Sequence, residues 1–402
     1  MQSLDWNHNV IDVFTSLEQT GDVFYLDDVT NHGWSYIILL EDPLSGDPWE
    51  LMDTNESKQK KPGPMPFTGG LVGWLSYGVN KGKNWNNPKK HSSQPLFSFF
   101  DARYILCFHK DYGWWTNAIS RFKDLKVEKK SKNIPNGNMY STISFDEYAS
   151  EINLIKKMIM KGEMYEANFT FKLKGEIEDS LNLYLQFREK CKTSLCCFAK
   201  SQDLIIGSGS PELFLSCSDG VYLSEPMKGT ASHCDIDLTK DKKERSELAI
   251  VVDLVRNDFY KCCNFESVNV SDASLVKEYP TLKQAVARVS GVKRKDVKKW
   301  EMIKSLLPSG SISGAPRSRV IPHLDLAEKN PRGIYCGAMG WWAYGGDFKL
   351  SLPIRTFVAR DKNLEYSVGS GITWRSDPEK EWQECKIKAN CLNESFKGAI
   401  AW

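Results

Sequence analysis

Residues 144–175 read SFDEYASEINLIKKMIMKGEMYEANFTFKLKG. Ser144 and Glu147 have the spacing of a capping box, and the isoleucines that follow lie three or four residues apart on one helical face. Gly162 is suited to end that helix, and residues 167–175 then alternate between apolar and polar as a strand does. The segment therefore predicts a helix followed directly by a strand.

Further strands and helices are mixed along the chain. Short strands are predicted at 204–207, 213–216 and 221–224, and no regular βαβ period connects the elements. This mixture favours an α+β fold over a doubly wound parallel sheet.

Three polar stretches, at 55–66, 80–94 and 123–138, are predicted to be surface loops because they are rich in Lys, Asn and Pro. The last one separates an aromatic N-terminal third from the rest of the chain. We expect a single unit over 1–402, with a variable N-terminal subdomain at 1–138 and the catalytic region at 139–402.

The composition is that of an ordinary globular protein, with 41% apolar residues, 26% charged residues and a net charge of +2. This charge balance provides no general attraction for nucleic acid or an anionic membrane. The sequence also lacks a secretory signal pattern and any apolar run near the ~20 residues of a membrane helix. The 11 cysteines include no C-x-x-C pair, which favours reduced cysteines in a cytoplasmic protein.

Four ordered motifs carry the functional signal. They are SPE at 210–212 followed by EPMKGT at 225–230, ELAIVVDLVRND at 247–258, PSGSISGAP at 308–316 with RGIYCGAMG at 332–340, and GSGI at 369–372 with DPE at 377–379. In this order and spacing they resemble the chorismate-utilising enzymes, which include anthranilate, aminodeoxychorismate, isochorismate and salicylate synthases. The resemblance implies two stacked, antiparallel-rich sheets with outer helices and the site between them.

Carboxylates on two predicted helices are the candidate metal ligands. A helix that begins after Asp377 puts Glu381, Glu384 and Lys388 on one face. A second helix carries Glu247, and such a pair of carboxylate faces suits Mg²⁺. The resemblance assigns the metal to Glu247 and Glu384 and makes Lys388 a candidate catalytic residue. Without the resemblance, both faces would be read as solvated helix surfaces.

Chorismate, the substrate that the resemblance implies, is a dianion and needs fixed donors. Arg355 offers a planar fork for a carboxylate. The amides of Gly229 and Gly371 can approach an anion closely because glycine has no Cβ. By the same resemblance, the other candidate substrate-binding residues are Thr230, Gln284, Ser313 and Tyr335.

Lys228 distinguishes between members of the family. Relatives that make anthranilate or isochorismate usually have Ala before the Gly-Thr pair, whereas Lys resembles the aminodeoxychorismate synthases, in which it is the nucleophile. A lysine attacks only as the neutral amine, which burial and a nearby Mg²⁺ would favour. Glu212, sixteen residues upstream, matches the family's acid/base residue. Outside this motif, Lys228 would be read as a surface ion-pair partner.

The resemblance thus implies amination of chorismate to 4-amino-4-deoxychorismate, the precursor of 4-aminobenzoate and folate. A lysine adduct forms first, and ammonia then displaces the lysine. No glutaminase signature is visible in this chain. We therefore expect the ammonia to come from a separate glutamine amidotransferase subunit or from free ammonium.

The sequence departs from the family pattern at several positions. Gln284 replaces the usual His, residues 231–233 (ASH) replace an Arg-Pro-Arg run, Ser313 replaces Thr and Glu166 replaces Gln. Two alternatives stay open: an anthranilate or isochorismate synthase of the same fold, and a non-catalytic chorismate-binding relative that regulates or scaffolds. Lys228 argues against the first, and the retained set of acidic and basic motif residues argues against the second.

Overall fold

The computed structural model describes residues 1–402 except 60–61, 81–91, 232–241 and 280–281. It gives only the backbone assignment, and no side-chain placement, for 229–231, 242–247, 272–275, 277–279 and 282–283.

The helix and strand predicted for the opening segment are both present. Helix α4 (Phe145–Met160) begins with the predicted capping box: Ser144 Oγ accepts from the Glu147 amide over 3.2 Å, and Glu147 Oε2 accepts from the Ser144 amide over 2.9 Å. Gly162 follows with a φ of +75°, which glycine adopts at little cost. Strand β9 (Glu166–Ile177) comes next, so the prediction is confirmed.

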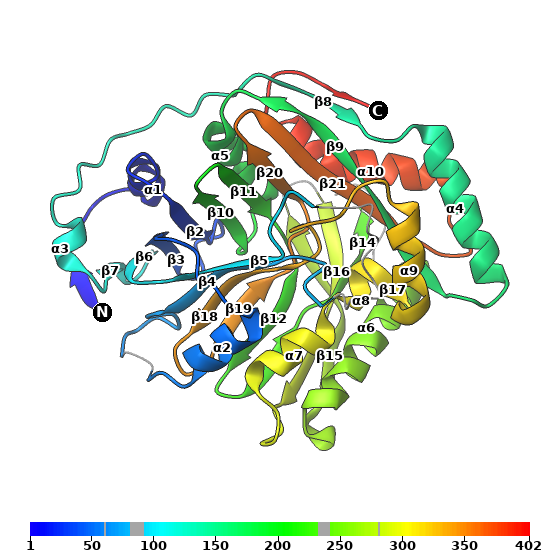
Figure 1. Cartoon of the computed structure of the whole chain (residues 1–402), viewed down its shortest axis with the longest axis horizontal. Helices are drawn as coiled ribbons and strands as arrows, with labels where there is room; N and C mark the ends of the chain where they lie inside the picture. The colour runs from blue at the N-terminus through cyan, green and yellow to red at the C-terminus, as the bar shows by residue number, and fades with distance from the viewer. Residues whose placement is uncertain (60–61, 81–91, 232–241, 280–281) are drawn as a thin grey trace.

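Two sheets dominate the described part of the chain (Figure 1). All pairings in the larger sheet are antiparallel except β22 with β8, and β17 adds to β9 at its side. Its path is β1 (Gln2–Leu4), β7 (Gly113–Thr116), β6 (Tyr104–His109), β3 (Ser35–Leu39), β2 (Val23–Asp27), β10 (Cys196–Ser201), β11 (Leu204–Gly209), β20 (Thr356–Arg360), β21 (Asn363–Ile372), β9, β8 (Gly137–Ser141) and β22 (Ile400–Ala401), with β17 at Gly314–Ala315.

The smaller sheet is antiparallel throughout its described pairings, and β15 pairs with β16 outside the main path. The path is β14 (Met227–Ala231), β16 (Leu282–Val292), β13 (Val221–Ser224), β12 (Leu213–Ser218), β19 (Phe348–Ser351), β18 (Ala338–Ala343), β4 (Gly70–Leu75) and β5 (Phe97–Asp101), with β15 at Asn269–Tyr279. The strands predicted at 204–207, 213–216 and 221–224 are thus β11, β12 and β13.

Three apolar clusters give the molecule its layers. One lies between the sheets and includes Phe24 and Ile206 of the larger sheet with Trp74 and Met339 of the smaller one. A second packs the larger sheet against α1 (Val10–Glu18), α4, α5 (Ser180–Cys191) and α10 (Pro378–Asn393). The third packs the smaller sheet against α2 (Pro48–Glu56), α6 (Lys242–Cys262) and α7 (Lys299–Leu306). Figure 1 shows α4 and α10 at one side of the stack and α2, α6 and α7 at the other.

This arrangement confirms the predicted α+β class with two stacked sheets and outer helices. Both sheets contain strands from before and after residue 138, where the sequence suggested a boundary. The remaining helices are short or lie near the site: α3 (Ile119–Phe122), α8 (Gly310–Ser313) and α9 (Arg317–Ala327), with a 3₁₀ turn at Phe265–Ser267.

Two further sequence observations can be compared with the structure. Among the described residues, no helix combines the length and apolar content needed to span a bilayer. The ten cysteines that the structure describes are all buried and free, as expected of small core side chains.

Candidate active site

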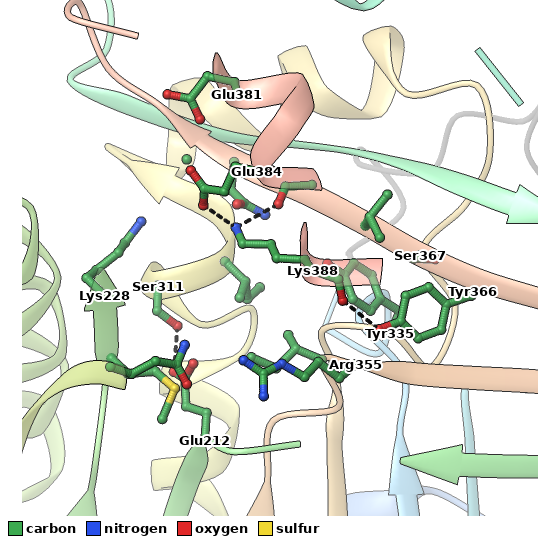
Figure 2. Close-up of a pocket in the computed structure, with 18 residues that line it drawn as sticks. Glu212, Lys228, Ser311, Tyr335, Arg355, Tyr366, Ser367, Glu381, Glu384 and Lys388 are labelled. Atoms are coloured by element: carbon green, nitrogen blue, oxygen red, sulfur yellow. Dashed lines mark hydrogen bonds and ion pairs between the residues drawn. The ribbon is translucent and has the colours of Figure 1, made fainter. Parts of the chain in front are cut away.

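One pocket is lined by residues from both sheets and from two helices (Figure 2). β9 and β21 contribute from the larger sheet, β14 and β16 from the smaller sheet, and α8 and α10 complete the wall. Eight of the candidate catalytic, substrate-binding and metal-binding residues line it: Glu212, Lys228, Gln284, Tyr335, Arg355, Gly371, Glu384 and Lys388.

Glu212 immediately precedes β12, and only 4% of it is exposed. Ser311 of α8 donates a hydrogen bond to Glu212 Oε1 over 2.9 Å. Burial raises the pKa of the Glu212 carboxyl to about 8, although the Ser311 hydroxyl and the positive charge of Lys228 act in the opposite direction. Glu212 is therefore mostly protonated at neutral pH and can act as a proton donor.

Lys228 lies on β14, opposite Ala285 of β16, and its amine contacts the carboxylate of Glu166 at the start of β9. The side chain of Glu166 is only 4% exposed, and that of Lys228 12%. Gly371 packs against both: a Cβ there would lie 2.6 Å from Glu166 Oε1 and 2.7 Å from Lys228 Nζ. Only glycine at 371 leaves room for this pair and for a ligand beside it.

Helix α10 presents charged groups to the pocket as its spacing predicts. It begins after Asp377, whose side chain accepts from the Lys380 amide, and Glu381, Glu384 and Lys388 all line the pocket. Lys388 Nζ lies 2.7 Å from Glu384 Oε1 and donates to the Gly369 carbonyl over 3.0 Å (Figure 2). Burial lowers the pKa of Lys388, but the charge of Glu384, its hydrogen bond to the amine and the nearby Cys385 together outweigh burial, and the pKa is raised. Lys388 is thus a cation at neutral pH.

Arg355 precedes β20 and points into the same space as Glu212 and Lys388 (Figure 2). It is 7% exposed, and its φ of +48° lies in the left-handed region, which costs a non-glycine residue on the order of 1–3 kcal/mol. The Gly209 amide donates to the Arg355 carbonyl over 2.9 Å and helps to hold this conformation. Strained backbone of this kind persists where surrounding contacts hold it, often at functional sites, and here it directs the guanidinium into the pocket.

Gln284 of β16 lies in the pocket wall and is 8% exposed, so it does not face solvent. Among the described residues, its Oε1 accepts no hydrogen bond. A buried amide oxygen without a partner costs about 1–3 kcal/mol, so a ligand donor or a water would complete it. Tyr335 is also buried in the wall, and burial raises the pKa of its hydroxyl well above the usual value, which keeps it a neutral donor.

The remaining candidate site residues either lie outside the pocket lining or have side chains that the structure does not describe. Ser313 is buried outside the pocket lining, and its hydroxyl donates to the Ser309 carbonyl over 2.7 Å. Gly229 and Thr230 continue β14, and Thr230 pairs with Gln284 across a register shift, but their side-chain surroundings are not described. Glu247 belongs to α6, and its side chain lies outside the described residues.

The acidic groups of α10 are compatible with Mg²⁺. Glu381 and Glu384 supply hard oxygen donors to the pocket wall, one helical turn apart. Within the described residues, no three His, Cys, Asp or Glu side chains converge as a complete metal cluster. The Glu247 side chain lies outside the described residues, so the predicted pair of Glu247 and Glu384 stays a prediction.

The family described as chorismate binding enzyme matches residues 22–394, almost the whole chain. The chain belongs to that family. The chorismate-utilising resemblance read from the motifs is therefore confirmed, and the pocket described above is the candidate chorismate site.

Curated relatives of the family point to two neighbouring activities. The chain is 30% identical over 384 residues to the probable chloroplastic aminodeoxychorismate synthase of rice, covering 81% of this chain and 43% of that protein. It is 33% identical to the aminodeoxychorismate synthase of Streptomyces pristinaespiralis, covering 84% and 53%. An anthranilate synthase component I-like protein of Synechocystis is 26% identical, covering 84% and 74%. The chain spans about half the length of the first curated relatives that it matches.

A solved structure supports the fold. The anthranilate synthase component I of Streptococcus pneumoniae superposes with a TM-score of 0.78 at 21% identity, covering 92% of this chain and 89% of that one. This likeness confirms the fold of a chorismate binding enzyme.

The sequence motifs did not indicate the roles of two residues near the pocket, Ser311 and Arg332. Ser311 has no mark in the sequence beyond its place in the PSGSISGAP motif. Arg332 is buried, and it donates to the Ile312 carbonyl of α8 over 2.7 Å and to the Asn168 carbonyl of β9 over 2.6 Å. Arg332 opens the RGIYCGAMG motif and thus ties two walls of the pocket together, a contact that sequence spacing does not reveal.

Proposed function

We propose that this chorismate binding enzyme aminates chorismate to 4-amino-4-deoxychorismate through a covalent adduct on Lys228. The observation that carries the proposal is that Lys228 and Glu212 line the same pocket. Lys228 is an amine in a mostly enclosed position, and Glu212 is a carboxyl with a pKa of about 8. A nucleophile and a proton donor that reach one ligand are the two groups that displacement of a hydroxyl needs.

In the proposed reaction, Arg355 grips one substrate carboxylate with its guanidinium fork. The amine of Lys228 adds to the ring, the double bonds shift, and the hydroxyl leaves with the proton of Glu212. Ammonia then adds at the former hydroxyl carbon and expels the lysine. Tyr335 and Gln284 present polar groups in the wall and would orient the ring substituents.

The metal and the source of ammonia belong to the same proposal. Glu384, with Glu247 of α6, would hold Mg²⁺, which supplies positive charge for a substrate carboxylate when bound. Ammonia would come from a glutamine amidotransferase subunit or from free ammonium. Lys388 remains a cation beside Glu384 and adds to the positive field that attracts the dianion.

The test is to incubate the pure chain with chorismate, Mg²⁺ and ammonium and to identify the product by mass. Aminodeoxychorismate supports the proposal. Anthranilate or isochorismate would instead assign the chain to another reaction of the family, which its anthranilate synthase relatives make the second candidate. Binding of chorismate without turnover would support a non-catalytic role.

A further inference from the structure

The contact between Glu166 and Lys228 adds a residue to this chemistry. Glu166 stands at the first position of β9, is 3% exposed, and its carboxylate contacts the amine of Lys228. Two buried carboxyls therefore lie near one lysine: Glu166 of β9 contacts its amine, and Glu212 lines the same pocket as Lys228. We propose that Glu166 is the base that takes the proton of Lys228 and holds it while the lysine is bound to the substrate. This inference rests on the amination proposed above.

The two carboxyls have different surroundings, and this difference suggests their roles. Glu212 is enclosed with a neutral serine hydroxyl as its hydrogen-bond donor, which leaves it protonated near neutral pH. Glu166 instead touches the amine of Lys228 itself, so it is the group placed to exchange a proton with that amine. Pairs of titratable groups whose environments differ in this way divide into an acid and a base. Glu212 is then the donor, and Glu166 is the acceptor.

The position of Gly371 explains when the proton would move. Glu166 Oε1 and Lys228 Nζ occupy the side of Gly371 where a side chain would stand, so a substrate carboxylate bound at Gly371 would lie beside the Glu166 carboxylate. Repulsion between two carboxylates favours protonation of one of them. The closest proton is that of the Lys228 ammonium, and the neutral acid–amine pair that results needs less solvation than the ion pair once the ligand has displaced water.

The protons and bonds balance over one turnover. The Lys228 ammonium gives a proton to Glu166, and the freed lone pair forms the nitrogen–carbon bond. The ring double bonds shift, the carbon–oxygen bond breaks, and the hydroxyl takes the Glu212 proton to leave as water. Ammonia then forms its bond, the lysine leaves as a neutral amine and recovers the proton from Glu166. The ammonium of the product returns a proton to Glu212.

Other charged groups also face this pocket. Lys388 lies close enough for Lys228 to influence its pKa, and Arg355, Glu381 and Glu384 complete the lining charges. The carboxylate of Glu166 contacts the amine of Lys228 directly. A change at Glu166 therefore acts first on the lysine.

The experiment compares wild type with Glu166→Gln, which keeps the shape and removes the acceptor, and with Glu166→Asp, which keeps a carboxylate. Amination of chorismate by ammonium, with Mg²⁺ present, is followed from neutral to alkaline pH. In parallel, Lys228 is labelled with an amine-acylating reagent without substrate, and the label is quantified by mass spectrometry. Glu18→Gln is the control, since Glu18 pairs with Lys200 over 2.8 Å and neither residue lines the pocket.

We expect Glu166→Gln to label faster than wild type, because the ammonium has lost its carboxylate partner. It should nevertheless aminate about 10²–10⁴-fold more slowly than wild type at neutral pH. Its rate relative to wild type at the same pH should recover by up to about tenfold per pH unit, because solvent must now remove the proton. Glu166→Asp should retain more amination than Glu166→Gln. Glu18→Gln should match wild type in both assays.

Faster labelling together with undiminished amination would show that Glu166 only restrains Lys228, and unchanged labelling would show that the contact does not control the amine; either overturns the inference. If wild type itself makes no aminodeoxychorismate, the proposed function fails instead. The two failures are thus distinguishable.

Discussion

Ser311 Oγ donates to Glu212 Oε1 over 2.9 Å, so a residue of α8 helps to set the acidity of the carboxyl that immediately precedes β12. The hydrogen bond favours the ionised carboxylate, whereas burial favours the neutral acid and prevails. The short helix α8 is therefore part of the proton chemistry of the pocket and not only one of its walls.

This relationship predicts the alkaline limb of the pH profile. In wild type, kcat/KM for chorismate should fall as pH rises through about 8, because Glu212 loses the proton it must donate. Ser311→Ala removes the hydrogen bond to the carboxylate and should move that limb to higher pH. Ser305→Ala on α7, outside the pocket, should leave it unchanged. A limb that stays in place in Ser311→Ala would contradict the assignment of the limb to Glu212.

The raised pKa of Glu212 also predicts a dependence of stability on pH. Between its ordinary value of 4.5 and about 8, the unfolded chain releases this proton while the folded chain keeps it, so the free energy of unfolding falls as pH rises through that window. Glu212→Gln removes this contribution. As pH rises across this window, the free energy of unfolding of the variant should increase by on the order of a few kcal/mol relative to that of wild type. Denaturant unfolding of both proteins at both ends of the window measures this change. A difference in unfolding free energy that stays the same at both pH values would contradict the raised pKa of Glu212.

For the metal, we expect activity to require Mg²⁺ and to disappear in excess chelator. Glu247→Gln and Glu384→Gln should abolish turnover while the thermal unfolding midpoint stays close to wild type, because each keeps the shape of the side chain. Glu379→Gln is the control, since Glu379 is exposed on the same helix as Glu384. Full activity in excess chelator would exclude a metal requirement.

For the nucleophile, Lys228→Arg keeps a positive charge beside Glu166 but removes the reactive amine. Amination should fall by at least about 10²-fold, the scale of losing one positioned catalytic group. Intact mass of wild type with chorismate and no ammonium should reveal an adduct that maps to Lys228. Lys200→Arg, remote from the pocket, should aminate normally. Unchanged amination by Lys228→Arg would make Lys228 a structural residue.

The product should keep its enolpyruvyl side chain. Formation of anthranilate needs a second step in which pyruvate leaves and the ring aromatises, and that step moves protons. A histidine, with an unperturbed pKa of about 6.5, can do this, whereas the amide of Gln284 only exchanges hydrogen bonds. Mass and fluorescence of the product decide the point. Anthranilate from the pure wild-type chain would overturn both the assignment and the role given to Gln284.

A large part of the fold follows from local sequence. The capping box at Ser144 and the Asp377-Pro378 start place α4 and α10, because caps and helical periodicity act over a few neighbouring residues. The same local spacing correctly put Glu381, Glu384 and Lys388 on one face toward the pocket. The ordered motifs identified the family.

Only the tertiary structure brought Glu166 to Lys228 and Ser311 to Glu212, since 62 residues separate the first pair and 99 the second. Sheet pairing and packing create such contacts, and no local spacing in the chain encodes them. The acidity of Glu212 and the enclosure of Gln284 depend in the same way on burial by distant segments. The sequence by itself determined which chemical groups this protein has, and the fold decided which of them act on each other.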